Sequence, residues 1–423
     1  MGDAMRDIVL FIDVPDSGSA ALYHRAARSL DLVPVLVTES PSGGSDVAAG
    51  RLHVPKIALA EVLSAIDRIG RERVAGVFTC ASVGAELAAR LAAALGRPHA
   101  DPEAISLCND KHRLRAFLER KGLNTVPYRH VTTVSDARRA AESLGGAVVV
   151  KPVFSTGSDG VRVCRNCDEA ISHVETLLKR KSDGVVIEKY IDGPMFAVEL
   201  FDGKALVVKR NFISKGPFPI TIGTDTPASL QNELCLDIKN YAASIIKVVG
   251  IASGPSALQL SASGVDKYLI EINPRPFLQS TIDTFIATNI NMAALCLKFS
   301  CGIPYTQEFF VSQKNRACAT RYVVRNGSSV RAINRVAEAR KLPGVKSVHI
   351  TDSRFDRRGP ATSAFDRIAT VHSEADTIEE AAACAELALS KLTVVYDRFP
   401  VDLFKYYSRK LSLSWIKLLR NWN

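Results

Sequence analysis

Short apolar runs alternate with helical patterns over the first hundred residues. The apolar run 8–12 is followed by an alanine-rich stretch with helical spacing at 19–30 and by a second apolar run at 33–37. A later helical pattern at 83–95 ends just before a glycine and a proline. Apolar strands that alternate with helices are typical of parallel βαβ units. The pattern therefore predicts a Rossmann-like domain at residues 1–105.

The periodicity changes after this domain. Residues 106–185 contain two helical stretches and an apolar strand that runs into a loop of small residues, and residues 186–315 contain several strand patterns that we expect to form a mixed sheet. In a last unit at 316–400, the capping box at 377–380 opens an alanine-rich helix. The prediction is a protein of α/β and α+β class, followed by an amphipathic tail at 401–423.

A glycine-rich loop follows Lys151 between two predicted strands. Small residues let backbone N–H groups approach a phosphate closely, and a neighbouring lysine adds a positive charge. The loop is therefore a candidate phosphate-binding element, although most loops of this composition are only turns. Its candidate residues are Ser155, Thr156, Gly157, Ser158 and Gly160.

Two further strand ends carry candidate residues for nucleotide and metal binding. Glu188 offers an acidic group for ribose hydroxyls, and the apolar residues near it suit an adenine ring. Farther along, Glu271 and Asn273 are separated by one residue, so both point to the same face of a strand. Two hard oxygen donors on one face suit magnesium. Arg275 beside them is able to neutralise charge on a transferring phosphoryl group.

The order of these motifs resembles the ATP-grasp superfamily over nearly the whole chain. The resemblance implies an ATP-grasp fold with an N-terminal pre-ATP-grasp domain, a small lobe at 106–185 and a large lobe at 186–315. It also implies ATP and magnesium, with manganese possible, as cofactors. The residues that carry it are Asn109-Asp110-Lys111, Lys151-Pro152 with its loop, Glu188-Lys189-Tyr190-Ile191 and Glu271-Ile272-Asn273-Pro274-Arg275.

The resemblance gives each motif a role. Lys111 and Lys151 would contact the ATP phosphates under the glycine loop, Glu271 and Asn273 would bind magnesium, and Arg275 would be the catalytic residue that holds an acyl phosphate. The adenosine would lie against a hinge strand. The residues implied there are Glu188, Lys189, Tyr190 and Ile191, with Glu199 on the next strand either reaching the nucleotide or lying solvated.

The C-terminal stretch 333–395 resembles single-chain L-amino-acid ligases that make dipeptides. This resemblance implies an ATP-dependent carboxylate–amine ligase. In such a reaction a carboxylate attacks the γ-phosphate, an amine attacks the resulting acyl phosphate, and ADP and phosphate are released. The expected partners are a small carboxylate and an amine, and a peptide-like natural product is the expected outcome. A carboxylase-type enzyme of the same fold and a degenerate ATP-binding protein are the alternatives.

Two positions depart from the family pattern. Gln259 occupies the place of an acidic magnesium ligand on the preceding strand, so it is kept as a neutral candidate ligand for the metal. After Arg275 the family usually has a glycine-rich substrate loop, but residues 276–281 read Pro-Phe-Leu-Gln-Ser-Thr. These bulkier side chains predict an unusual acceptor pocket.

Composition narrows the choice of partners and location. Lysine and arginine number 54 against 44 aspartate and glutamate, a net charge of +10, of which the tail contributes five bases minus one acid, or +4. The remaining excess is mild, so no nucleic acid partner is expected. No apolar run is long enough to span a bilayer. Nine scattered cysteines without a signal peptide indicate reduced thiols in a cytoplasmic protein.

Aromatic and leucine residues recur at three- and four-residue spacing in the tail at 401–423, with basic residues between them. This pattern predicts an amphipathic helix. It would contact a membrane surface or a protein partner, or pack on its own chain or on a second subunit in a homodimer.

Overall fold

The computed structural model describes most of the chain. The described residues are 7–12, 20–39, 50–123, 125–180, 182–263, 266–277, 280–351, 355–396 and 400–402.

The N-terminal domain is a parallel sheet with strand order β3-β2-β1-β4, covered by helices. Its strands are short and almost wholly buried at the centre of the sheet, which is why they read as continuous apolar runs. The Rossmann-like prediction is therefore confirmed. The bounds are β1 Ile8–Ile12, α1 Ala20–Ser29, β2 Val33–Thr38, β3 Gly50–His53, α2 Leu59–Ile69, η1 Arg71–Arg73, β4 Val74–Phe78 and α3 Ser82–Ala94.

Two consecutive helices lead into the small lobe. The Asp101 side chain caps the first and the Asp110 side chain caps the second, each by accepting a hydrogen bond from a backbone N–H of the first turn. The lobe itself is an antiparallel sheet of order β5-β8-β6-β7, packed against α6 and α7. The bounds are α4 Pro102–Asn109, α5 Lys111–Arg120, β5 Tyr128–Val131, α6 Val134–Leu144, β6 Val148–Pro152, β7 Arg162–Cys164, α7 Cys167–Lys179 and β8 Val185–Lys189.

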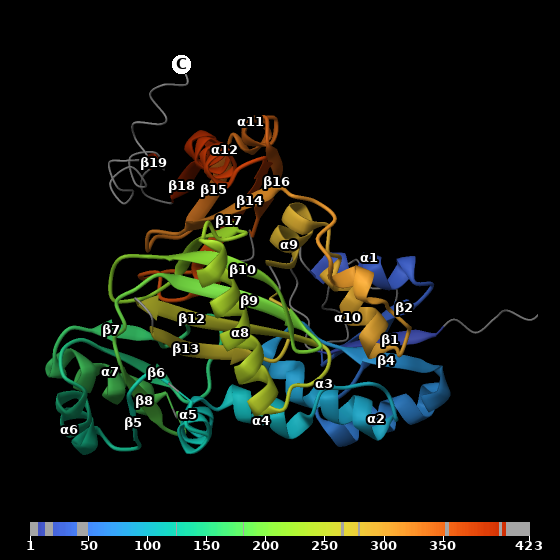
Figure 1. Ribbon diagram of the computed structural model, residues 1–423, viewed down its shortest axis with the longest axis horizontal. Helices are drawn as coiled ribbons and strands as arrows, with labels where there is room; N and C mark the ends of the chain where they lie inside the picture. The colour runs from blue at the N-terminus through green and yellow to red at the C-terminus, as the bar shows by residue number, and fades with distance from the viewer. Residues whose placement is uncertain are drawn as a thin grey trace, which may run out of the picture.

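An eight-stranded sheet forms the centre of the molecule (Figure 1), in the order β13-β12-β9-β10-β11-β14-β17-β16. Every pair of neighbouring strands in it is antiparallel, so the predicted mixed sheet is wrong. Several of these strands are joined by short turns, which favour antiparallel pairing because parallel strands need long crossovers. The bounds are β9 Met195–Phe201, β10 Lys204–Ile213, β11 Thr221–Thr226, α8 Asn232–Val249, β12 Pro255–Ser263, β13 Asp266–Asn273, β14 Ala317–Val324, β16 Val345–Ile350 and β17 Arg367–Ala375.

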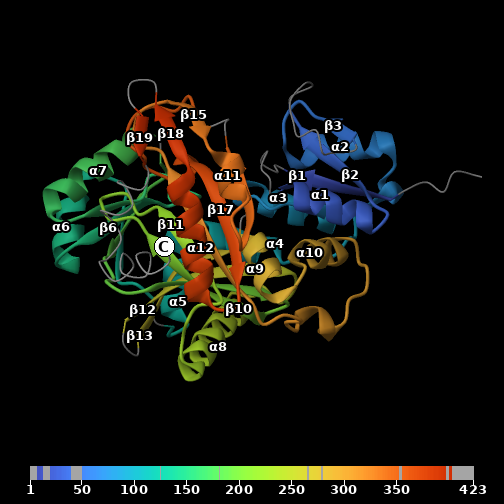
Figure 2. The ribbon, with the colours of Figure 1, turned by 90° about the horizontal axis from the view of Figure 1, so that it is seen from above.

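The large lobe was expected to end at residue 315. Strands before and after this boundary belong to the same sheet. Seen from above (Figure 2), α12 lies over the strands of the C-terminal part, and its predicted capping box at Thr377 and Glu380 is present. The tail beyond residue 402 lies outside the described residues. The remaining bounds are α9 Ser280–Thr288, α10 Met292–Ser300, η2 Gln307–Phe310, β15 Val330–Asn334, α11 Val336–Arg340, η4 Ala364–Asp366, α12 Ile378–Lys391, β18 Thr393–Tyr396 and β19 Pro400–Asp402.

The N-terminal domain shares a hydrophobic core with the large lobe. Phe11 and Phe78 of its sheet belong to one buried cluster with Leu295 of α10 and Phe201 of β9. Burial of such side chains is worth about 2 kcal/mol each. The domain is thus fixed relative to the central sheet, which matters because the end of β4 faces the candidate site.

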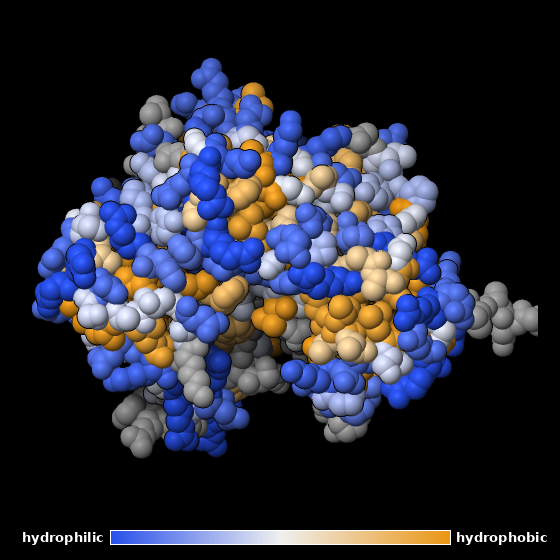
Figure 3. Space-filling view, turned by 90° about the horizontal axis from the view of Figure 1, so that it is seen from below, coloured by the Kyte–Doolittle hydropathy of each residue, from blue (hydrophilic) through white to orange (hydrophobic). Residues whose placement is uncertain are grey.

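Two surface features complete the description. Seen from below (Figure 3), hydrophilic residues alternate with apolar patches over the face. Among the residues that the structure describes, no helix is both long and apolar enough to cross a bilayer.

The shared core gives a stability prediction at Gly76 of β4. A methyl group there would collide with the Ser300 carbonyl oxygen and would lie 2.7 Å from Cys301 Sγ. Gly76→Ala should therefore lower the melting temperature by about 2 °C, the effect of roughly 2 kcal/mol of overpacking in a chain of this length. Gly50→Ala is the matched control, because its methyl group would meet only Val35 Cγ2 at 3.4 Å. Equal melting temperatures for the two variants in differential scanning fluorimetry would contradict the close packing of β4 on α10.

Candidate nucleotide and metal site

One large cavity, with a volume of about 1230 Å³, lies between the small lobe and the central sheet. Its wall includes residues from β6, β8, β10 and β13, and from η4 of the C-terminal part. Most of the predicted site residues line it. They are Lys111, Lys151, Ser155, Thr156, Gly157, Ser158, Glu188, Lys189, Tyr190, Ile191, Gln259, Glu271, Asn273 and Arg275.

The glycine loop crosses from the small lobe to the C-terminal part of the chain. Gly157 has φ +63°, and its carbonyl oxygen accepts a hydrogen bond of 2.8 Å from the Ala364 N–H. A methyl group on Gly157 would lie 3.2 Å from the Phe365 ring. Gly160 also has positive φ but packs on Pro152 and is not among the residues that line the cavity. Glycine therefore serves the backbone turn at both positions and close approach to η4 at the first.

Two lysines approach the cavity from the small lobe. Lys111, at the start of α5, donates to the Ser155 hydroxyl and carbonyl oxygens, both at 3.2 Å. Lys151 pairs with Glu188 Oε2 at 2.7 Å, and the three side chains of Lys111, Lys151 and Glu188 are all buried. The cavity thus has two preformed positive charges next to the glycine loop.

Glu188 has a different environment from the predicted one. Arg115 binds its other oxygen, with Nη2 at 3.0 Å and Nε at 3.1 Å, and the side chain is only 3% exposed. Burial opposes its negative charge, yet the charges of Arg115 and Lys151 hold its pKa below the ordinary value. Both carboxylate oxygens have cationic partners, so the structure places Glu188 between two cations and not free to face a ribose.

The hinge after β8 forms an apolar end of the cavity. Ile191 and Tyr190 line it together with Val149, Met195 and Ile270. A mainly apolar slot of this kind suits an aromatic base, with backbone groups left to provide hydrogen bonds. Lys189 also lies in this wall.

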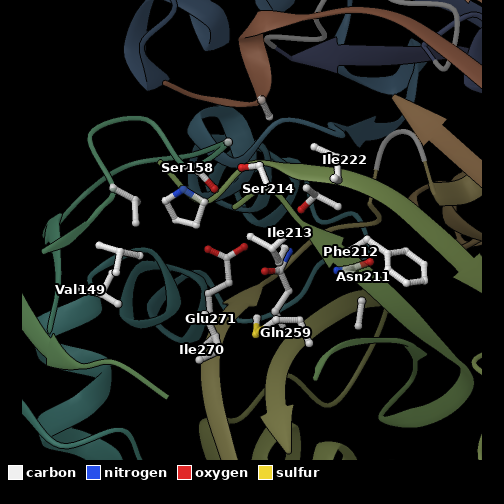
Figure 4. Close-up of a pocket in the computed structure, with 18 of the residues that line it drawn as sticks. Val149, Ser158, Asn211, Phe212, Ile213, Ser214, Ile222, Gln259, Ile270 and Glu271 are labelled. Atoms are coloured by element: carbon white, nitrogen blue, oxygen red, sulfur yellow. The ribbon is translucent and has the colours of Figure 1, made fainter. Parts of the chain in front are cut away.

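The candidate metal ligands lie on neighbouring strands. Gln259 of β12 is directly opposite Glu271 of β13 in the sheet register, and both side chains rise into the pocket (Figure 4), where Ser158 lies across from them. Asn273 Nδ2 donates to Glu271 Oε1 at 2.9 Å. No group of three or more His, Cys, Asp or Glu side chains suited to a metal occurs in the described part of the chain. A metal here would have one carboxylate and two amide oxygens, a set that fits magnesium with added water and phosphate ligands.

Arg275 is held in place beside the candidate metal ligands. Its guanidinium donates to Ser82 Oγ at 2.7 Å, to Asn273 Oδ1 at 3.0 Å and to the Pro276 carbonyl oxygen at 3.0 Å. Burial lowers its pKa, with Glu271 opposing that effect. The side chain is therefore preorganised, so it can meet developing negative charge without rearrangement.

Glu199 is a buried residue of β9 in the central sheet and is not among the residues that line the cavity. Its carboxylate pairs with Lys209 at 3.1 Å and accepts a hydrogen bond from Thr284. Glutamate and lysine are both almost fully buried. This arrangement balances the charge of Lys209, which does line the cavity.

Several residues of the site were not predicted from the sequence. Arg115 lies four residues after Lys111 on α5, and an arginine on the apolar face of a predicted helix was the available signal. Ser82, Ala364 and Phe365 come from distant parts of the chain and carry no sequence signal of their own.

Comparisons with known families match two parts of the chain. Residues 144–283 match the ATP-grasp domain, so the chain contains an ATP-grasp domain. Residues 321–397 match the L-amino acid ligase C-terminal domain 2, so the predicted resemblance to L-amino-acid ligases is confirmed.

Three similar proteins illustrate the match. An uncharacterised protein y4rH of Sinorhizobium fredii is 27% identical over 64% of this chain and 59% of its own length, and a D-alanine–D-alanine ligase of Bacillus anthracis is 35% identical over 27% and 38%. The aligned regions thus span about half the length of these curated relatives. A crystal structure of L-amino acid ligase from Bacillus licheniformis has a TM-score of 0.78 at 22% identity, covering 93% of this chain and 99% of that one. This likeness shows a shared fold.

The buried Lys111 predicts a pH dependence of nucleotide binding. Burial lowers its pKa to about 8, although Glu271 opposes the shift. Lys111 is thus charged at pH 7 and loses its charge as the pH rises through 8, so affinity for MgADP should fall above pH 8 by up to about tenfold per pH unit. Lys111→Arg keeps its charge and should give a flatter profile. Calorimetric titration between pH 7 and 9.5 tests this, and identical profiles for wild type and variant would contradict it.

Proposed function

We propose that this protein is an ATP-dependent carboxylate–amine ligase that forms an amide or peptide bond through an acyl phosphate and releases ADP and phosphate. The observation that carries the proposal is one cavity with two functional sides. Lys111, Lys151 and the glycine loop lie on one side, and Glu271, Asn273 and Arg275 lie on the other. The ATP-grasp match and the C-terminal match support the same conclusion.

In this proposal the lysines and the loop backbone bind the β- and γ-phosphates, while the apolar slot at Ile191 holds the adenine. Magnesium, or manganese, would be held by Glu271, Asn273 and Gln259, and it would supply charge neutralisation at the phosphates. Arg275 lies beside these ligands, where its guanidinium orients the substrate carboxylate and stabilises the acyl phosphate. No side-chain nucleophile is needed, because positioning and charge stabilisation account for phosphoryl transfer.

The substrates proposed are an amino acid or another small carboxylic acid and an amine. The names of the similar proteins, an L-amino acid ligase and a D-alanine–D-alanine ligase, favour amino acids for both. A nucleotide-binding protein without turnover is the second candidate, because Gln259 leaves the metal position with a single carboxylate.

Phosphate release tests the ligase directly. The protein with ATP and magnesium is offered amino acids singly, in pairs and with bicarbonate, and responding mixtures are analysed by mass spectrometry. We expect release that requires two partners, with a product heavier by their sum less one water. Release with bicarbonate alone would instead indicate the carboxylase type.

A pair of variants controls this assay. Arg275→Lys keeps the charge but loses the planar fork, so turnover should fall about a hundredfold or more. The same change at the exposed Arg139 should leave turnover unaltered. Nucleotide binding without phosphate release in any mixture would contradict the ligase and favour the second candidate.

The metal position gives a separate prediction. Gln259→Glu adds a second carboxylate opposite Glu271, so affinity for Mn²⁺ in the presence of ADP should rise by about tenfold. Paramagnetic resonance titration measures this without turnover. Gln231→Glu adds the same charge at an exposed position before α8 and should change nothing. An unchanged affinity in Gln259→Glu would remove Gln259 from the proposed ligand set.

A further inference from the structure

Ser82 is a serine of the N-terminal domain that contacts both functional sides of the cavity. Its Oγ accepts a hydrogen bond from Arg275 Nε at 2.7 Å and lies 3.5 Å from Thr156 Oγ1 of the glycine loop. These two partners are 193 and 74 residues away in the sequence. One hydroxyl therefore lies between the phosphate-binding loop and the catalytic arginine.

The local backbone shows why this hydroxyl is available. Ser82 is the first residue of α3, but the helix has no side-chain cap at Ala81. Thr79 Oγ1 accepts a hydrogen bond from the Ala81 N–H at 3.0 Å and so fixes the turn from β4 into the helix. A serine at a helix start often caps its own helix. Here the hydroxyl instead contacts two other parts of the protein, and the shared core beneath it holds the turn rigid.

The Ser82–Arg275 hydrogen bond belongs to a series of hydrogen bonds that reaches the candidate metal ligands. From Ser82 the hydrogen bonds run to Arg275, from Arg275 Nη2 to Asn273 Oδ1 at 3.0 Å, and from Asn273 Nδ2 to Glu271 Oε1 at 2.9 Å. The Thr156 contact is the long one in this series. Hydrogen bonds in catalytic sites often tighten only when the substrate is bound.

We propose that Ser82 is a positioning residue that couples closure of the glycine loop to the orientation of Arg275. When the loop closes on the γ-phosphate, Thr156 approaches and donates to Ser82, which fixes the oxygen that accepts from Arg275. The arginine is then aligned when the phosphoryl group is in place. This inference rests on the proposed function, because the loop is taken to close on a nucleotide.

Hydrogen exchange tests the coupling without any amine or acid substrate. Protection of residues 152–164 is measured with magnesium and the β,γ-imido analogue of ATP. In Ser82→Ala we expect this protection to fall about tenfold while affinity for the analogue changes by less than about threefold. Ser82→Thr keeps the hydroxyl and should restore the protection. Ser29→Ala in α1 is the control, because its hydroxyl donates to the Ala26 carbonyl oxygen of its own helix.

Turnover separates positioning from a merely structural role. With the substrates found by the phosphate-release assay, Ser82→Ala should lower kcat about tenfold at nearly unchanged KM for ATP. Thr156→Val should have a similar effect, and the double variant should be no worse than either one because both remove the same coupling.

Each other outcome overturns a defined statement. Full protection of 152–164 in Ser82→Ala, or additive effects in the double variant, would overturn the role of Ser82 and leave the nucleotide site standing. Absence of analogue binding to the wild-type protein would overturn the proposed function and the coupling with it.

Discussion

The buried carboxylate of Glu188 is the interaction on which the arrangement of the site depends. It forms ion pairs with Lys151 of β6 and Arg115 of α5 at once, and all three side chains are almost fully buried. Arg115 also donates to the Ile270 carbonyl oxygen at 2.7 Å, one residue before Glu271 on β13. Loss of one partner from such a buried group typically costs about 3–5 kcal/mol. The small-lobe lysine and the candidate metal ligands of the large lobe are thus positioned relative to the same carboxylate.

The continuous antiparallel sheet brings the C-terminal part of the chain into the same site. Since β14, β17 and β16 extend the sheet that carries β12 and β13, η4 comes to lie over the glycine loop. Buried Asp366 fixes η4 by pairing with Arg325 at 2.7 Å, and backbone N–H groups of the preceding loop donate to its carboxylate. The match to an L-amino acid ligase C-terminal domain therefore concerns a part of the protein that contacts the glycine loop directly.

The sequence predicted the residues that belong to short motifs and missed those defined only by tertiary contacts. Lys151 and Glu271 line the cavity, because motif spacing determines which residues share a strand face. The partners of Glu188 could not be predicted, since Arg115 reaches it across 73 residues. Glu199 illustrates the same limit. It lies on the same strand face as Ala197, which lines the cavity, but its carboxylate contacts Lys209 and Thr284 beyond the cavity wall, and strand periodicity does not predict these tertiary partners.

The balance of charge around the cavity shows how the neutral side chain of Gln259 affects the site. Because Glu188 is committed to Arg115 and Lys151, Glu271 is the carboxylate left for a metal among the predicted ligands. Four positive charges lie on Lys111, Lys151, Arg115 and Arg275, and two negative charges lie on Glu188 and Glu271. This set therefore has a net charge of +2. An acid in place of Gln259 would reduce it to +1. In the proposed site, the neutral amide would leave more of the neutralisation of a polyphosphate to fixed side chains, of which Lys111, Lys151 and Arg275 line the cavity.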